Sequence, residues 1–93
     1  MKTTEKPVVL VVDDDQKHRE MIKTAFEGIG HKVNTASTFD SGVRIIKSIV
    51  DNEDDTIGVA LIDIHLKGHS TGLDLLRYIE SEAADRMAGY ALT

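Results

Sequence analysis

The sequence predicts an α/β fold in which helices cover both faces of a doubly wound parallel sheet. Val8 to Val12 form an unbroken apolar run, which is typical of a strand buried on both faces. Ile57 to Asp63 repeat this pattern of an apolar strand that ends in an aspartate. Segments with helical periodicity separate the strand-like segments, and no internal repeat or low-complexity segment competes with this arrangement.

The first predicted helix runs from Asp15 to Gly28. Asp15 suits its N-cap, and Gly28 and Gly30 suit its end. The segment from His31 to Ser37 follows as a short, partly alternating strand. The apolar residues of this helix recur at helical spacing, at Met21, Ile22, Ala25, Phe26 and Ile29.

Two more helices and a last strand complete the predicted order. The second helix begins at Phe39, and the third runs from Gly72 to about Ala84. Ala88 to Thr93 then form the fourth strand, and we expect the strand order 2-1-3-4. The apolar faces of the two helices are predicted at Phe39, Val43, Ile46 and Val50, and at Leu73, Leu76 and Ile79.

Composition limits the functions that the chain can have. Its 93 residues suit one small domain, and 41% hydrophobic and 29% charged residues are typical of a soluble globular protein. A formal net charge of -5 argues against direct contact with nucleic acid. The absence of cysteine excludes disulfides and thiolate zinc sites. No stretch approaches the roughly 18 apolar residues of a membrane span, so a cytoplasmic protein is expected.

Acidic residues follow two of the predicted strands. Asp13 and Asp14 end the first strand, and Asp63 ends the third. In open parallel sheets ligands bind beyond the carboxyl ends of the strands, where the strand order reverses. Neighbouring strands lie roughly 5 Å apart, so Asp13 and Asp14 are expected to face Asp63 across this distance. Such carboxylates repel one another unless a cation holds them, and oxygen ligands of this kind suit Mg²⁺. The sequence therefore predicts a Mg²⁺ site at this edge.

The segments "VVLVVDDD", "ALIDIHL", "TGLDLL" and "ALT" together resemble the receiver domain of bacterial response regulators, over essentially the whole chain. The resemblance implies a flavodoxin-like receiver fold and a two-component phosphorelay, in which a sensor histidine kinase or phosphotransfer protein is the partner. It implies that Asp63 is the phosphoacceptor, that Asp13 and Asp14 hold Mg²⁺ with Asp63, and that the backbone carbonyl of His65 adds a metal ligand. Thr93 matches the hydroxyl residue that contacts the phosphoryl group.

The chain also departs from the family pattern. Lys67 stands where the family usually has a proline, and the loop to Gly72 is one residue longer than the commonest form. The sequence stops at Thr93, so residues 1–93 are expected to be a C-terminally incomplete receiver domain. The family's later lysine and aromatic switch residue then have no counterpart, which predicts only weak phosphorylation. A non-phosphorylated receiver-like interaction module is the alternative function.

Other interpretations of the same residues carry less weight. The acids from Asp13 to Asp15 also suit a helix N-terminus, which for Asp15 is the preferred interpretation. Asp13 and Asp15 have the D-x-D spacing of haloacid-dehalogenase-type phosphatases, but 93 residues leave no room for the further acids and lysine of those enzymes. Residues 51–58 resemble a calcium loop without its glycine and final glutamate. His65 and His69 lie in a predicted loop and make a poor metal pair.

The predicted strand order leaves the fourth strand at an edge of the sheet. Unpaired backbone groups at such an edge favour pairing with another chain. We also expect aliphatic surface from Val8 to Val12 and from Val59 to Ile62 to be bare on one face. A homodimer is therefore expected, through edge pairing at Ala88 to Thr93 or through exchange of elements.

Overall fold

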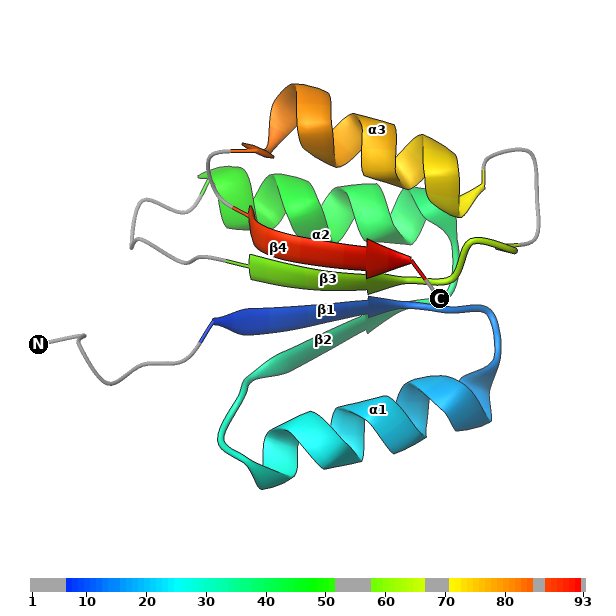
Figure 1. Cartoon of the computed structure of the whole chain (residues 1–93), viewed down its shortest axis with the longest axis vertical. Helices are drawn as coiled ribbons and strands as arrows, with labels where there is room; N and C mark the ends of the chain where they lie inside the picture. Colours follow the sequence, from blue (N-terminus) through cyan, green and yellow to red (C-terminus); the bar gives the residue numbers. More distant parts are fainter. Residues whose placement is uncertain (1–6, 52–57, 67–70, 85–86, 93) are drawn as a thin grey trace, which may run out of the picture.

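The computed structural model describes residues 7–51, 58–66, 71–84 and 87–92. Four parallel strands form one sheet in the order β2-β1-β3-β4, which confirms the predicted order. The helices α2 and α3 cover one face and α1 covers the other, so the molecule has three layers (Figure 1). The elements are β1 (Val8–Val12), α1 (Gln16–Gly28), β2 (Val33–Ala36), α2 (Phe39–Asp51), β3 (Gly58–Ile62), α3 (Gly72–Glu82) and β4 (Met87–Leu92).

The apolar run of β1 is buried on both faces of the sheet, as the sequence predicts. Side chains alternate along a strand, so Leu10 and Val12 face α2 and α3, while Val9 and Val11 face α1. All four are at most 1% exposed. The expectation that one face of β1 would be bare is therefore wrong, because α1 covers Val9 and Val11.

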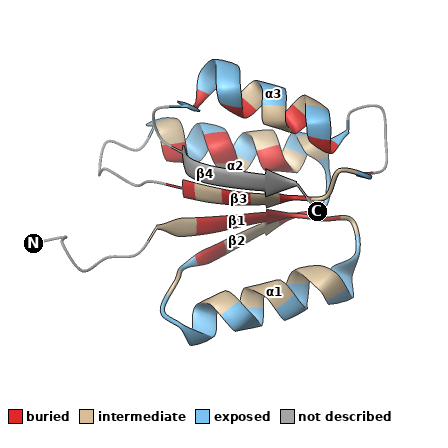
Figure 2. Ribbon diagram, viewed as in Figure 1, coloured by how far each residue is buried: buried red, intermediate tan, exposed pale blue. Residues whose placement is uncertain are grey.

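The helices on the two faces of the sheet bury their side chains to different extents. The cluster beneath α2 and α3 contains Ile46, Leu75 and Ile79, each fully buried. On the other face, Ile22 and Phe26 of α1 pack only partly buried against the sheet. Figure 2 shows buried residues on the inner sides of α2 and α3 but none on α1. The sheet is therefore held mainly from the side of α2 and α3.

The ends of α1 follow the predicted signals. Asp15 is its N-cap, and the Asp15 carboxylate accepts hydrogen bonds from the backbone N–H groups of Lys17 and His18. The helix ends at Gly28, and Gly30 then adopts a positive φ of 98°, a conformation that glycine adopts without strain. No helix in the described part of the chain is long and apolar enough to span a membrane.

Candidate functional site

Backbone hydrogen bonds bring Asp13 and Asp63 side by side at the carboxyl ends of β1 and β3. The N–H of Asp63 donates to the carbonyl of Val12 at 2.8 Å, which extends the strand pairing beyond Ile62. The N–H of Asp13 donates to the carbonyl of Ala36 at 3.0 Å. Both aspartates therefore have fixed backbones, and the sheet itself sets the spacing between their side chains.

The three predicted acidic residues converge at this edge. One carboxylate oxygen from each of Asp13, Asp14 and Asp63 lies within 4.8 Å of the other two. Asp13 is only 4% exposed, whereas Asp14 and Asp63 are half-buried. Three hard oxygen donors at the mouth of a buried strand suit Mg²⁺, which uses one or two carboxylates and keeps several waters. The residues present therefore fit this ion.

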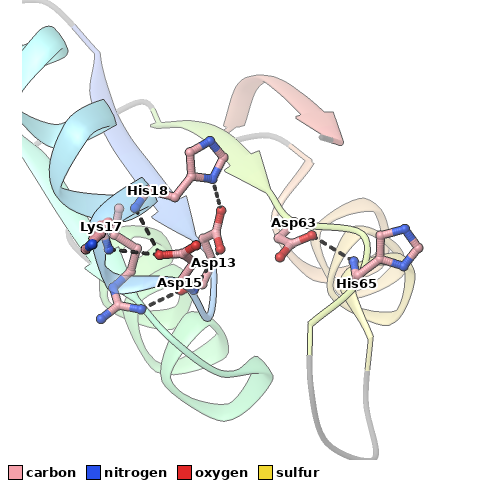
Figure 3. Close-up of polar contacts among 7 residues, drawn as sticks. Asp13, Asp15, Lys17, His18, Asp63 and His65 are labelled. Atoms are coloured by element: carbon pink, nitrogen blue, oxygen red, sulfur yellow. Dashed lines mark hydrogen bonds and ion pairs between the residues drawn. The ribbon is translucent and has the colours of Figure 1, made fainter.

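Both oxygens of the Asp13 carboxylate already accept hydrogen bonds. Oδ1 accepts from the backbone N–H of Asp15 at 2.9 Å, and Oδ2 contacts Nδ1 of His18. Figure 3 shows the His18 ring reaching from α1 to the Asp13 carboxylate, on the side that also faces Asp63. In addition, Arg19 Nη1 donates to the backbone carbonyl of Asp13 at 2.7 Å. Two side chains from the first turn of α1, those of His18 and Arg19, therefore hold Asp13 in place.

The charges of this cluster shift the pKa values of Asp13 and His18. Burial raises the pKa of Asp13, but the hydrogen bonds from the Asp15 backbone N–H and from His18, together with the charge of His18, more than offset this effect. The pKa of Asp13 therefore lies below its ordinary value. The hydrogen bond to Asp13 and the charge of Asp13 raise the pKa of His18 above its ordinary value, and the charges of Asp15 and Asp63 add to this effect.

Asp63 makes a local turn with the residues that follow it. Its Oδ1 accepts a hydrogen bond from the backbone N–H of His65 at 2.9 Å (Figure 3). This bond limits rotation of the Asp63 carboxylate. His65 itself is exposed, and its backbone carbonyl belongs to the same short turn.

Helix α3 begins directly against the backbone of Asp63. A Cβ on Gly72 would lie 2.2 Å from the carbonyl oxygen of Asp63, so only glycine permits this approach. Thr71 and Asp74 form a capping box at the start of α3, in which the Thr71 hydroxyl accepts from the Asp74 N–H and the Asp74 carboxylate accepts from the Thr71 N–H. The start of α3 therefore fixes the backbone next to Asp63.

Several predicted residues fall outside the described part of the chain. These are Lys67, His69 and Thr93, together with most of the segment that resembles a calcium loop. Asp15 lies within the described part of the chain and is the N-cap of α1. This fits the interpretation of Asp15 as a helix-terminal residue, and not its interpretation as part of a phosphatase D-x-D motif. Sequence reasoning missed His18 and Arg19, whose only signal was their place in the first turns after the acids.

An open parallel sheet with three converging carboxylates beyond its strand ends defines a doubly wound α/β protein whose acidic cluster has the oxygen donors that suit a divalent cation. The protein-family model for the response regulator receiver domain matches residues 9–93 of the sequence. The chain therefore belongs to this family. The resemblance found in the sequence is thereby confirmed. Family membership places the chain in two-component signalling.

The chain is also similar to part of a much longer protein. The chain is 30% identical over 94 residues to 3′3′-cGAMP-specific phosphodiesterase 2 of Vibrio cholerae serotype O1. That match covers 99% of this chain but only 18% of the phosphodiesterase. The chain therefore spans less than a fifth of the length of this relative.

Two solved structures have a similar fold. The response regulator StyR matches with a TM-score of 0.68 at 22% identity, over 92% of this chain and 41% of that chain. A fusion that carries the yeast Spc42 trimeric coiled coil matches with a TM-score of 0.72 at 18% identity, over 95% of this chain and 69% of that chain. At these identities the similarity establishes the fold alone.

Proposed function

We propose that the chain is a phosphoacceptor receiver domain over residues 1–93, which accepts a phosphoryl group on Asp63 with Mg²⁺ as cofactor. The observation that supports this most strongly is the convergence of Asp13, Asp14 and Asp63 within 4.8 Å at the ends of β1 and β3. A sensor histidine kinase or a phosphotransfer protein is the donor that fits this family.

Asp63 acts as the nucleophile in this proposal. One of its carboxylate oxygens forms a bond to phosphorus while the bond from phosphorus to the donor breaks, and the electron pair leaves with the donor. The hydrogen bond from His65 N–H to Oδ1 holds the carboxylate in one orientation during approach. Asp13, Asp14, Asp63 and the backbone carbonyl of His65 would hold Mg²⁺, which would supply positive charge to offset the charge on the phosphoryl oxygens. Thr93 is assigned the contact to the phosphoryl group.

Acetyl phosphate tests the chemistry directly. We expect Mg²⁺-dependent labelling, located at Asp63 by mass spectrometry after borohydride trapping. Asp63→Asn should lose the label, and Asp40→Asn, which alters an exposed acid in the first turn of α2, should keep it. An acyl phosphate trapped at another residue would refute the assignment of Asp63.

The metal site is tested separately from phosphorylation. Asp14→Asn removes one anionic oxygen from the cluster, so we expect Mg²⁺ to bind more weakly in isothermal titration calorimetry. Asp40→Asn again serves as the control with unchanged affinity. Equal Mg²⁺ affinity in Asp14→Asn and the wild type would remove Asp14 from the site.

A second candidate function is an interaction module that works without phosphorylation. It is favoured by β4, which pairs with β3 alone within the described sheet and so presents its other edge. Pairing of two copies through residues 88–93 would give a homodimer. Sedimentation at micromolar concentration, with and without acetyl phosphate, distinguishes the candidates. A dimer that ignores the phosphodonor supports the module, and a monomer at all concentrations contradicts edge pairing.

A further inference from the structure

His18 binds the same carboxylate that the proposed metal site needs. The Asp13 carboxylate is almost completely buried, and its oxygens are taken up by the Asp15 N–H and by Nδ1 of His18. A carboxylate oxygen accepts in two directions, but an N–H aimed at it brings positive charge to the place where a cation binds. The contact between His18 and Asp13 is thus unfavourable to a cation at Asp13.

Of the two partners, His18 is the one that can move. The Asp13 backbone is held on both sides, because its N–H donates to Ala36 and its carbonyl accepts from Arg19. The Asp15 N–H bond also belongs to the fixed turn that starts α1. The His18 side chain, by contrast, is 41% exposed and lies at the surface of the first helical turn. Rotation about its side-chain bonds takes the ring into water without disturbing the sheet.

We propose that His18 is an intramolecular competitor of the divalent cation, so that cation binding at Asp13 displaces the His18 ring. This inference rests on the proposed Mg²⁺ site. It does not depend on the charge of the ring, because an imidazolium and a neutral imidazole with its hydrogen on Nδ1 both donate to Asp13. His18 thereby raises the Mg²⁺ concentration at which the site is half occupied.

Two other roles for His18 predict the opposite sign. If the ring were a nitrogen ligand of the ion, its removal would weaken binding. If the ring served to orient Asp13 for the ion, its removal would also weaken binding. Competition alone predicts that removal of the ring makes Mg²⁺ bind more tightly, so the direction of the change decides among these roles.

Calorimetry with MgCl₂ at one fixed pH measures this direction. We expect His18→Ala to bind Mg²⁺ about threefold to tenfold more tightly than the wild type, which is the range set by one partly exposed hydrogen bond. Lys17→Ala is the matched control, because it removes an exposed cation from the same turn without touching Asp13. Equal or weaker binding by His18→Ala overturns the proposal, as does an equal gain in Lys17→Ala.

Nuclear magnetic resonance on the unaltered chain gives a second measurement. During a MgCl₂ titration the ring resonances of His18 should shift with the dissociation constant found by calorimetry. The ring of His31, which bonds the carbonyl of Pro7 at the opposite end of the strands, should not shift. If the ring resonances of His18 do not shift while Mg²⁺ binds, the competition is refuted but the metal site is not. A wild-type chain that binds no Mg²⁺ overturns the metal site as well.

Discussion

Substitution of Gly72 by alanine probes the contact between α3 and the residue proposed as phosphoacceptor. The new Cβ would lie 2.2 Å from the Asp63 carbonyl oxygen and 2.9 Å from Ile64 Cα. Both are backbone atoms, so no flexible side chain can yield. To reach even 3.0 Å, the lower limit seen for Cβ contacts, the helix and the strand end would have to separate by 0.8 Å. The start of α3 must therefore shift away from Asp63.

The expected cost follows from two opposing effects. Overpacking in a closely packed region costs about 1 to 3 kcal/mol of unfolding free energy. Alanine regains about 1 kcal/mol at most through its higher helix propensity. With this gain subtracted, we expect Gly72→Ala to lower the unfolding free energy measured in urea by up to about 2 kcal/mol. We also expect it to weaken Mg²⁺ binding, because the Asp63 backbone moves.

Gly28→Ala is the matched control for this experiment. Nothing lies within 4 Å of a Cβ at Gly28, at the end of α1, so this variant should be at least as stable as the wild type. If Gly72→Ala proved as stable as Gly28→Ala, with unchanged Mg²⁺ affinity, the close approach of α3 to Asp63 would be refuted.

Three further predictions concern capping, packing and pH. Asp15→Ala removes the N-cap of α1 and should lower the unfolding free energy by about 1 kcal/mol in urea, whereas an unchanged midpoint would mean that the cap contributes nothing. Leu75→Ala empties a fully buried position beneath α3 and should cost about 2 to 5 kcal/mol in the same assay, and a smaller loss would show that the core collapses around it. In the metal-free protein, the pKa of His18 measured by NMR should lie above 6.5 and fall in Asp13→Asn. Because this pKa is raised, the positive charge of His18 adds stability to the fold, fully below the unfolded pKa of about 6.5. This added stability is lost as the pH rises through the folded pKa, while the neutral ring keeps its hydrogen bond to Asp13.

The sheet and the acidic cluster could be predicted because they depend on regular geometry. A strand buried on both faces needs an unbroken apolar run, so β1 is visible in the sequence, and the aspartates after β1 and β3 must meet once the strands are parallel neighbours. The N-cap at Asp15 was predictable for the same reason, because local backbone geometry demands an acceptor there.

The contacts of α1 could not be predicted, because they depend on how the helix lies across the sheet. The sequence places His18 five residues after Asp13, but only the tilt of α1 and a side-chain rotamer bring its ring to that carboxylate. The same placement explains the wrong expectation of a bare β1, since α1 crosses over Val9 and Val11. Val59 and Leu61 of β3, farther from α1, remain half-buried.

Because the two faces are packed unequally, the helices are expected to differ in local stability. Among the described helices, α1 has no buried residue, so lifting it from the sheet exposes less apolar surface than lifting α2 or α3. Its amide hydrogens should therefore exchange with solvent through a low-energy local opening, earlier than those of the other helices. That opening also withdraws His18 and Arg19 from Asp13. Occupancy of the acidic cluster and the fraying of α1 are consequently linked equilibria, and amide exchange in α1 reports on both.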